Sequence, residues 1–363
     1  GKYSGWYAVR DESFYAEKDL IDGKAPTGAP VEWVEEPSYF FALSKLEEKL
    51  LEFYKNNPDF IKPSSRFNEV ISFVKGGLLD LSVSRTSFKW GIKIPNDPEH
   101  VMYVWLDALT NYISSLGYPD MENDSYKKFW PADLHVVGKD ILRFHAVYWP
   151  AFLMAAGLEL PKRIVAHGWW TVEGEKMSKS LGNVVDPAKL VEEYGLDQTR
   201  YFLMREIAFG QDGNFSKLSM TNRVNSELAN NIGNLAQRTL AFISKNAGAK
   251  IPDVNIEMLY KEALLDGLKD KVKAYQEFML EQKFNLALEV AINIANEANL
   301  FIDEQAPWAL RKTDMRRMEE VLYILIETLR YIAILLIPFM PDSMNKLLDQ
   351  LNVYVEERMF EFL

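Results

Sequence analysis

The chain has 363 residues, of which 48% are hydrophobic and 26% charged, and its formal net charge is −11. This length allows two or three domains, and the acidic balance argues against a protein that binds nucleic acid through its overall electrostatic field. No apolar run approaches the ~20 residues that a membrane span needs, and the absence of cysteine excludes disulfides and thiolate metal sites.

The first segment, residues 1–93, combines short strand patterns with two helical ones. Residues 3–9 predict a strand, and the leucines between positions 43 and 51 predict a helix. A second helix is expected over residues 66–75, where a Gly-Gly pair would end it. The segment therefore predicts a compact α+β piece, and we find no chemical motif in it.

From residue 94 the pattern changes to strands that alternate with helices. Buried strands are predicted over residues 101–105, 134–138 and 163–168. Helices over residues 106–116 and 140–156 would follow the first two. This alternation is typical of parallel βαβ units, in which ligands bind outside the carboxyl ends of the strands. Trp105, Gly138 and His167 lie at those ends, so we expect them to share one crevice.

The second half of the chain is predicted to be mostly helical. Residues 197–215 indicate a helix and a connector, and apolar periodicity then predicts long helices within residues 257–280, 282–302 and 316–337. Residues 217–250 contain five basic residues and one acidic residue, whereas the chain as a whole is acidic. We expect an all-α bundle with a locally basic first helix.

A loop with two lysines lies between these parts. Lys176 and Lys179 are placed between Gly174 and Gly182, and Asp186 before a proline predicts the cap of a new helix. A doubly cationic loop of this kind can close over a polyphosphate and offset the charge that develops as pyrophosphate leaves. The alternative is an ordinary solvated surface loop.

The two predicted helices of the βαβ units carry candidate pocket residues. The residues that share their faces at spacings of three or four are Trp105, Ala108, Leu109, Tyr112, Ile141, His145 and Trp149. A thioether suits such a lining, because sulfur–aromatic contacts contribute roughly 0.3–1.5 kcal/mol each. Just before the second helix, Gly138 permits close approach of a ribose, and Asp140 can accept hydrogen bonds from the ribose hydroxyls. The alternatives are a packed core and an ordinary strand–helix turn.

A polar stripe follows the helix predicted over residues 219–246. Its members are Arg223, Glu227, Asn230, Asn234 and Arg238. Asparagine and arginine read base edges, and Trp308 could stack on an unpaired base. The alternatives are a solvent-facing stripe and a core tryptophan.

The string KMSKS at residues 176–180 is the signature of class I aminoacyl-tRNA synthetases, and the whole motif set resembles the methionyl-tRNA synthetases. The further motifs that carry this resemblance are residues 104–108, 138–141, 144–145, 149, 167–168, 234–238 and 306–308. The resemblance implies an α/β plus all-α fold. Residues 1–93 would be part of an α+β connective insertion, residues 94–216 the second half of a Rossmann catalytic domain, and residues 217–363 an α-helical anticodon-binding bundle.

The resemblance also implies a reaction and residue roles. Methionine would be activated with ATP and Mg²⁺ to methionyl-adenylate and passed to tRNA(Met), and the seven pocket residues named above would hold methionine. ATP would lie against Gly138, Asp140, His167, Trp169 and Lys179. Lys179, supported by Lys176, would stabilise the adenylation transition state. The residues that would read the anticodon are Asn234, Arg238 and Trp308.

Some features depart from the family pattern. The His-Ile-Gly-His-type signature of the first Rossmann half does not occur, so we expect a C-terminal portion that is inactive alone. Leu109 stands where many relatives have proline. No cysteine knuckle is present, so we expect no structural zinc, and without an extra dimerisation module we expect a cytoplasmic monomer. Alternative functions are another KMSKS enzyme of the leucine, isoleucine or valine type, and a non-catalytic tRNA-binding module.

Overall fold

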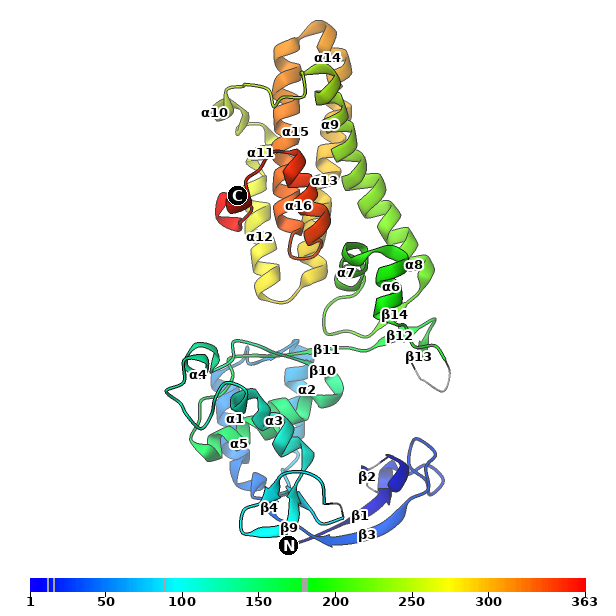
Figure 1. Cartoon of the computed structure of the whole chain (residues 1–363), viewed down its shortest axis with the longest axis vertical. Helices are drawn as coiled ribbons and strands as arrows, with labels where there is room; N and C mark the ends of the chain where they lie inside the picture. Colours follow the sequence, from blue (N-terminus) through cyan, green and yellow to red (C-terminus); the bar gives the residue numbers. More distant parts are fainter. Residues whose placement is uncertain (12, 16, 88, 178–181) are drawn as a thin grey trace. The chain divides into compact units, whose positions relative to one another are not determined.

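The computed structural model describes residues 1–11, 13–15, 17–87, 89–177 and 182–363, which form two units (Figure 1). The first unit, Gly1–His167, begins with an antiparallel sheet in the order β2-β1-β3. Its strands are β1 (Lys2–Ala8), β2 (Ser13–Tyr15) and β3 (Glu32–Pro37). The strand predicted over residues 3–9 is therefore confirmed as β1.

A parallel sheet lies at the centre of the first unit, in the order β10-β11-β5. Its strands are β10 (His135–Gly138), β11 (Ile164–His167) and β5 (Ile61–Lys62). The two strands predicted near residues 134–138 and 163–168 are thus confirmed, together with their parallel direction. The third strand comes from the first ninety residues, where the sequence indicated no connection to this sheet, because a two-residue strand carries no periodicity.

Helices cover the parallel sheet. The predicted helices near residues 43–51 and 66–75 are confirmed as α1 (Glu47–Asn56) and α2 (Ser64–Lys75). Both pack with β5, β10 and β11 around one core that includes Leu50, Val70, Val137 and Ile164. The helix predicted over residues 140–156 is found as a 3-10 turn (Lys139–Ile141), a π-helical turn (Phe144–Tyr148) and α5 (Trp149–Ala156).

The strand predicted over residues 101–105 is wrong in its end and its direction. The strand β9 (Asp97–Met102) is antiparallel to β7 (Ser84–Arg85) and β8 (Lys93–Ile94), and it does not join the parallel sheet. The helix α3 (Val104–Ser114) begins two residues after it, so Trp105 lies in the first helical turn. A short apolar run fits a strand and a buried helix start equally well, and here Tyr103 is the extended residue at which the chain turns.

The remaining elements of the first unit are short. They are β4 (Phe40–Phe41), β6 (Leu81–Ser82) and α4 (Asp124–Phe129). The helix α4 contributes Tyr126 to a second, aromatic-rich core with Leu109, Trp130 and Trp149. This core connects α3 to the helix that follows β10.

The second unit, Gly168–Leu363, begins with a small sheet in the order β13-β12-β14. Its strands are β12 (Trp170–Val172), β13 (Glu175–Lys176) and β14 (Gly213–Phe215), and the connecting helices are α6 (Pro187–Tyr194) and α7 (Leu196–Arg205). The predicted cap of α6 is confirmed, because Asp186 Oδ1 accepts from the Ala188 N–H at 2.9 Å. Gly168 allows a close backbone approach, since a Cβ there would lie 2.2 Å from the Gln211 carbonyl oxygen.

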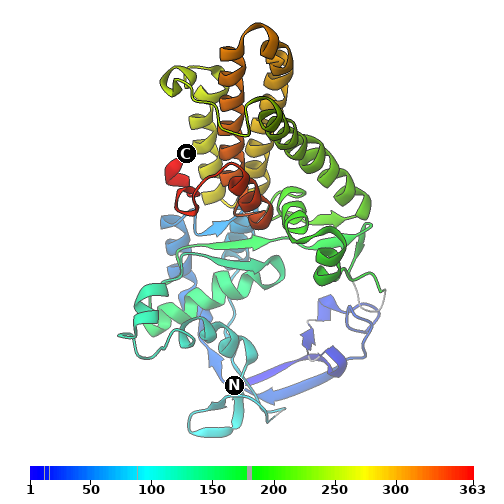
Figure 2. The same cartoon turned by 45° about the horizontal axis from the view of Figure 1, so that its top comes forward.

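A helical bundle forms the rest of the second unit (Figures 1 and 2). Its first helix runs without a break through α8 (Lys217–Arg223), a π-helical segment (Val224–Gly233) and α9 (Asn234–Asn246). The other helices are α10 (Ile256–Leu259), α11 (Ala263–Asp266), α12 (Leu268–Leu280), α13 (Phe284–Gln305), α14 (Pro307–Thr313), α15 (Met315–Leu336) and α16 (Pro341–Gln350). The predicted all-α bundle is confirmed, and α15 is its central, mostly buried helix.

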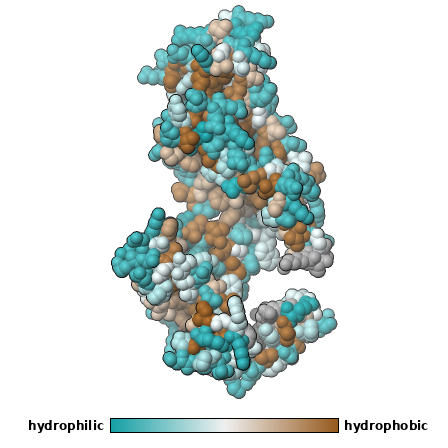
Figure 3. All heavy atoms as spheres, in the orientation of Figure 1, coloured by the Kyte–Doolittle hydropathy of each residue, from teal (hydrophilic) through white to brown (hydrophobic). Residues whose placement is uncertain are grey.

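The face of the bundle seen in Figure 3 is mostly hydrophilic, with smaller groups of hydrophobic residues between the hydrophilic ones. This distribution is expected for amphipathic helices that bury one face each. Within the described residues, no helix combines the length and the hydropathy that crossing a bilayer requires.

Candidate functional site

An aromatic cluster joins α3 to the helix that follows β10. The Tyr112 hydroxyl and His145 Nε2 are 2.8 Å apart, and His145 Nδ1 donates to the Ile141 carbonyl oxygen at 3.0 Å. Because a carbonyl oxygen only accepts, Nδ1 carries the proton, and Nε2 accepts from the tyrosine. Burial lowers the pKa of His145, and the bond to Ile141 opposes this shift only in part. The imidazole is therefore neutral and held in one tautomer.

The rings around this pair form one packed group. Trp105 stacks on Phe144 with 3.7 Å between ring centroids, and it meets His145 edge-on at 6.2 Å. Tyr112 and Trp149 lie 6.3 Å apart, and Trp149 is almost fully buried. Phe144 was not expected to line the pocket, because an α-helical spacing places it away from His145. The π-helical turn over Phe144–Tyr148 brings both rings to the cluster.

His135 is a second residue that the sequence analysis did not assign. It begins β10, is 5% exposed, and its ring lies 4.4 Å from Tyr112. Burial, followed by the nearby His145, lowers the pKa of His135 to about 4. Its Nε2 and the Trp149 Nε1 are buried without a hydrogen-bond partner among the described residues. Its position at the amino end of a strand gave no signal, because the rule for ligand sites concerns carboxyl ends.

The seven predicted pocket residues do not all occupy the same place. Trp105, Leu109, Tyr112, His145 and Trp149 belong to the aromatic cluster. Ile141 packs on the core of the parallel sheet and reaches the cluster through its carbonyl oxygen. Ala108 is on the exposed side of α3. Five of the seven residues thus lie in one cluster, whereas Ile141 and Ala108 lie outside it.

The turn after β10 brings three predicted residues to one sheet edge. Gly138 pairs with His167 across β10 and β11. A Cβ on Gly138 would lie 2.5 Å from Asp140 Oδ1 and 3.8 Å from His167 Cε1. Both Asp140 and His167 are exposed, and Trp169, which is 42% exposed, is the second residue of the second unit. The edge is open and offers a carboxylate and an imidazole around a glycine.

The lysine loop begins as a hairpin in the second unit. β12 and β13 are joined through Glu173 and Gly174, which have φ angles of 49° and 85°, and the Gly174 N–H donates to Asn214 Oδ1 at 2.7 Å. Lys176 ends β13, and Gly182 again has a left-handed φ of 67°. The prediction for Lys179 falls on residues 178–181, which lie outside the described residues.

Two of the predicted anticodon-reading residues are in contact. The Arg238 guanidinium lies 5.6 Å from the Trp308 ring centroid and its Nη2 is 2.5 Å from Asp303 Oδ1. Trp308 is 46% exposed, so its alternative interpretation as a core residue is wrong. Arg238, Trp308 and Lys245 line a pocket of about 250 Å³. Asn234 is exposed one turn before Arg238 on α9.

The polar stripe itself is not continuous. Arg223 and Glu227 do not face solvent with Asn234, because both join an ion network with α7 and the residue after it. The Tyr201 hydroxyl also donates to Glu227 at 2.5 Å, and burial together with this carboxylate raises the pKa of Tyr201. The π-helical segment Val224–Gly233, which includes Glu227, breaks the α-helical spacing on which the stripe is predicted.

Among the described residues, no three His, Asp or Glu side chains are grouped so that they could hold a metal ion. The predicted absence of structural zinc stays a prediction. A divalent cation that enters with a nucleotide would take its ligands largely from the phosphates and water.

The structure combines parallel βα units that carry polar groups at the strand edge with a lysine-bearing hairpin and a helical bundle, and the comparisons identify this combination as a class I tRNA synthetase. A family model for "tRNA synthetases class I (M)" matches residues 8–240, and one for "Anticodon binding domain of methionyl tRNA ligase" matches residues 251–360. The chain belongs to the methionyl-tRNA synthetase family. The predicted fold class, a class I catalytic domain followed by a helical anticodon-binding region, is confirmed.

Individual relatives agree with this assignment. Methionine–tRNA ligase of Rickettsia conorii is 63% identical over 367 residues, which cover 100% of this chain and 72% of the relative. The enzyme of Brucella suis is 54% identical, over 99% of this chain and 71% of the relative. Mycobacterium tuberculosis methionyl-tRNA synthetase in complex with methionyl-adenylate superposes with a TM-score of 0.94 at 49% identity, over 99% of this chain and 73% of that one. These relatives favour a methionine enzyme over the leucine, isoleucine and valine alternatives.

Proposed function

We propose that this chain carries methionine-activating and tRNA-binding parts of a methionine–tRNA ligase, with the residue roles given below. The observation that carries the proposal is the neutral Tyr112–His145 pair inside an aromatic cluster beside a polar sheet edge. Aromatic rings and a neutral imidazole favour the binding of an apolar thioether between them. A cationic imidazole would instead require water or a counter-charge in the same place. Within the cluster, Trp105, Tyr112, His145 and Trp149 are the residues proposed to surround the methionine side chain, with Ala108, Leu109 and Ile141 at its margins.

The sheet edge is the proposed ATP site. Gly138 leaves room for close approach of the nucleotide, Asp140 accepts from ribose hydroxyls, and His167 borders the same edge. Trp169 and Lys179 complete the residues assigned to ATP. The proposal requires the nucleotide's α-phosphate to lie next to the methionine carboxylate.

The proposed reaction is an in-line displacement. A methionine carboxylate oxygen attacks the α-phosphorus of ATP, a new P–O bond forms, and pyrophosphate leaves with the electrons of the broken bond. Lys179, with Lys176, offsets the charge that develops on the leaving group, and Mg²⁺ bound with ATP neutralises further charge. A hydroxyl oxygen of the terminal ribose of the tRNA then attacks the carbonyl carbon of methionyl-adenylate. The new ester bond forms as the acyl–phosphate bond breaks, AMP leaves with the electrons of that bond, and the hydroxyl proton is released.

The proposed tRNA contact is the α9–α14 side of the bundle. Asn234 and Arg238 would read base edges of the anticodon, and the half-exposed Trp308 would stack on an unpaired base. The division at residues 93/94 and 216/217, the cytoplasmic location and the monomeric state remain part of this proposal. Sedimentation of the purified protein tests the last of these.

Pyrophosphate exchange by the full-length protein tests the proposal. We expect methionine-dependent exchange that leucine does not support, and a fall of ~10²–10³-fold in kcat for Lys179→Ala, the scale of one lost transition-state donor. We expect no exchange by residues 1–363 alone, because they carry no His-Ile-Gly-His-type signature. Absence of exchange in the full-length protein, with tRNA binding retained, would instead favour a non-catalytic tRNA-binding module.

A further inference from the structure

The first helix of the bundle changes its winding just before the predicted anticodon-reading residues. Residues Val224–Gly233 are π-helical, whereas α8 before them and α9 after them are α-helical. Hydrogen bonds from i to i+5 place more residues in each turn than bonds from i to i+4. The direction in which α9 presents Asn234 and Arg238 therefore depends on how this segment is held.

The upstream part of the segment is held by Glu227. Its carboxylate accepts from the Tyr201 hydroxyl at 2.5 Å, from Arg205 Nη2 at 3.2 Å and from Arg223 Nη1 at 2.9 Å. Arg205 also lies 3.7 Å from Glu289 on α13. The Glu227 side chain is only 14% exposed, so these charge-assisted bonds are sheltered from solvent.

The downstream part is held by Asn231. Its Nδ2 donates to Asn296 Oδ1 at 2.8 Å, and its Oδ1 accepts from Asn299 Nδ2 at 2.7 Å. Asn231 is 8% exposed, and both partners belong to α13. Side-chain amides paired in this way favour one rotational setting of the helix about its axis, because turning the helix would leave buried polar atoms without partners.

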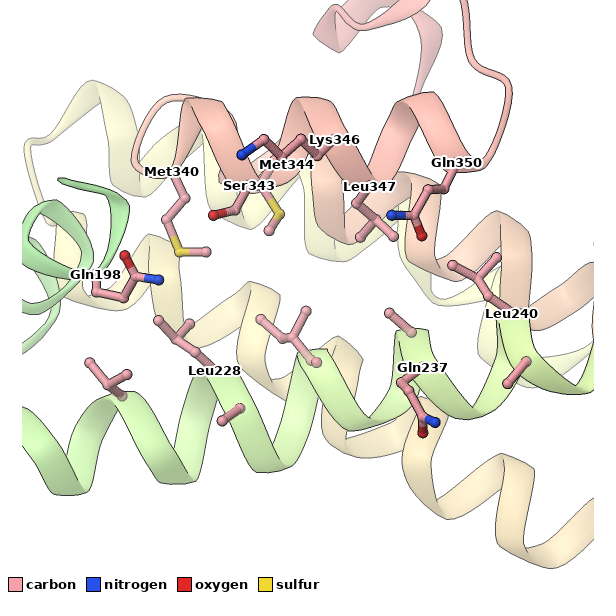
Figure 4. Close-up of a pocket in the computed structure, with 16 residues that line it drawn as sticks. Gln198, Leu228, Gln237, Leu240, Met340, Ser343, Met344, Lys346, Leu347 and Gln350 are labelled. Atoms are coloured by element: carbon pink, nitrogen blue, oxygen red, sulfur yellow. The ribbon is translucent and has the colours of Figure 1, made fainter. Parts of the chain in front are cut away.

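Packing on the side of the helix that faces α16 is incomplete. A groove of about 600 Å³ separates residues 224–241 from α16. Figure 4 shows Leu228 and Leu240 on one wall, with Met340, Met344 and Leu347 on the opposite wall. Side chains that do not interlock across a gap of this size constrain rotation weakly. Gln237 lines both this groove and the pocket at Trp308, so a rotation of the helix would change both.

We propose that Glu227 and Asn231 are positioning residues for anticodon recognition, because they fix the rotation at which Asn234 and Arg238 face the tRNA. The proposal rests on the anticodon-reading role proposed above for α9 and goes beyond it by naming residues that do not touch RNA. The contacts of Arg238 with Asp303 and Trp308 depend on the same rotation.

Aminoacylation kinetics of the full-length protein test this inference. We expect Glu227→Gln and Asn231→Ala each to raise the KM for tRNA bearing a CAU anticodon by about 5- to 30-fold. Both should also reduce discrimination against an altered anticodon and leave pyrophosphate exchange unchanged. Glu262→Gln is the matched control, because Glu262 accepts from Arg317 on α15 at 2.7 Å, an ion pair of the same bundle in which neither partner belongs to α8 or α9.

A double-variant cycle separates positioning from general stabilisation. If Glu227 acts through Arg238, adding Glu227→Gln to Arg238→Ala changes the KM for tRNA less than 2-fold. Effects that multiply in the double variant would overturn the inference, as would an unchanged KM in both single variants while Arg238→Ala raises it. An unchanged KM in Arg238→Ala would overturn the anticodon assignment and this inference with it. Asn231→Ala leaves the ion network intact, so the test stands even if Glu227→Gln does not fold.

Discussion

At the scale of single residues, the Tyr112–His145 hydrogen bond holds the His145 imidazole in one tautomer within the proposed methionine pocket. Tyr112→Phe removes the donor and leaves His145 Nε2 buried without its partner, a loss on the order of 1–3 kcal/mol. We expect the KM for methionine in pyrophosphate exchange to rise roughly 10-fold, equivalent to about 1.4 kcal/mol, with a smaller change in kcat. Tyr126→Phe is the matched control, because Tyr126 is buried in the same core. Equal effects of the two variants would contradict the role given to Tyr112.

His135 gives a second prediction at this scale, on stability and pH. Its pKa is lowered from 6.5 to about 4 by burial, so between these values the unfolded chain binds a proton that the folded chain does not. Stability contributed by neutral His135 is therefore present above pH 6.5 and is lost as the pH falls towards 4, by at most about 3 kcal/mol.

Chemical denaturation at several pH values measures this effect. The free energy of unfolding of the wild type should fall towards that of His135→Gln as the pH is lowered through this window. Taking the difference between the two proteins removes the contribution of the carboxylates, which is common to both. A difference that is constant from pH 7 to pH 4 would show that His135 titrates as in the unfolded chain.

At the scale of elements, the close approach of the segment before β14 to the segment before β12 depends on Gly168. A Cβ at Gly168 would lie 2.2 Å from the Gln211 carbonyl oxygen and 2.6 Å from the Asp212 nitrogen, both of them backbone atoms. Gly168→Ala should therefore destabilise the second unit by about 2–3 kcal/mol, near the upper end for overpacking. Thermal unfolding measures it. Gly267→Ala is the control, because its nearest atom is 3.4 Å away, and it should leave the melting temperature almost unchanged.

The elements also show where sequence patterns were sufficient. The helices α1, α2 and α6 and the strands β10 and β11 were predicted close to their observed bounds, because caps and apolar periodicity are local. The run at residues 101–105 was misassigned, because its apolar residues fit a strand and a helix start alike. The contribution of β5 to the parallel sheet was missed, since pairing between residues so distant in sequence leaves no local pattern.

At the scale of the whole molecule, an acidic chain is proposed to bind an acidic polymer. With a net charge of −11, contact with tRNA must depend on local cations such as Lys245, which lines the pocket with Arg238 and Trp308. Lys245→Ala should lower the slope of log affinity against log salt by about one, and should weaken binding to different anticodons uniformly. Filter binding over a salt series measures this slope.

The control for that experiment is Lys273→Ala on α12. Lys273 is exposed, and α12 packs on α13 and α15 on the side of the bundle away from α9 (Figures 1 and 2). An equal loss of slope in both variants would mean that tRNA responds to total charge, and the α9–α14 interface would then lose its support.

The sequence by itself determined the family and most helices of this protein. The sequence was sufficient for the motif of the lysine loop and for the strand–helix turn at Gly138. It was also sufficient for the spacing of Trp105 and Tyr112 on one helix and of His145 and Trp149 on the other. Each of these patterns depends on residues close together in the chain.

Only the tertiary structure decided which side chains meet across elements. It placed Phe144 and His135 in the aromatic cluster, and it moved Glu227 from the expected stripe into an ion network. The physical reason is the same in each case. A π-helical turn and a buried charge are maintained by partners on other elements, and no local spacing rule contains those partners.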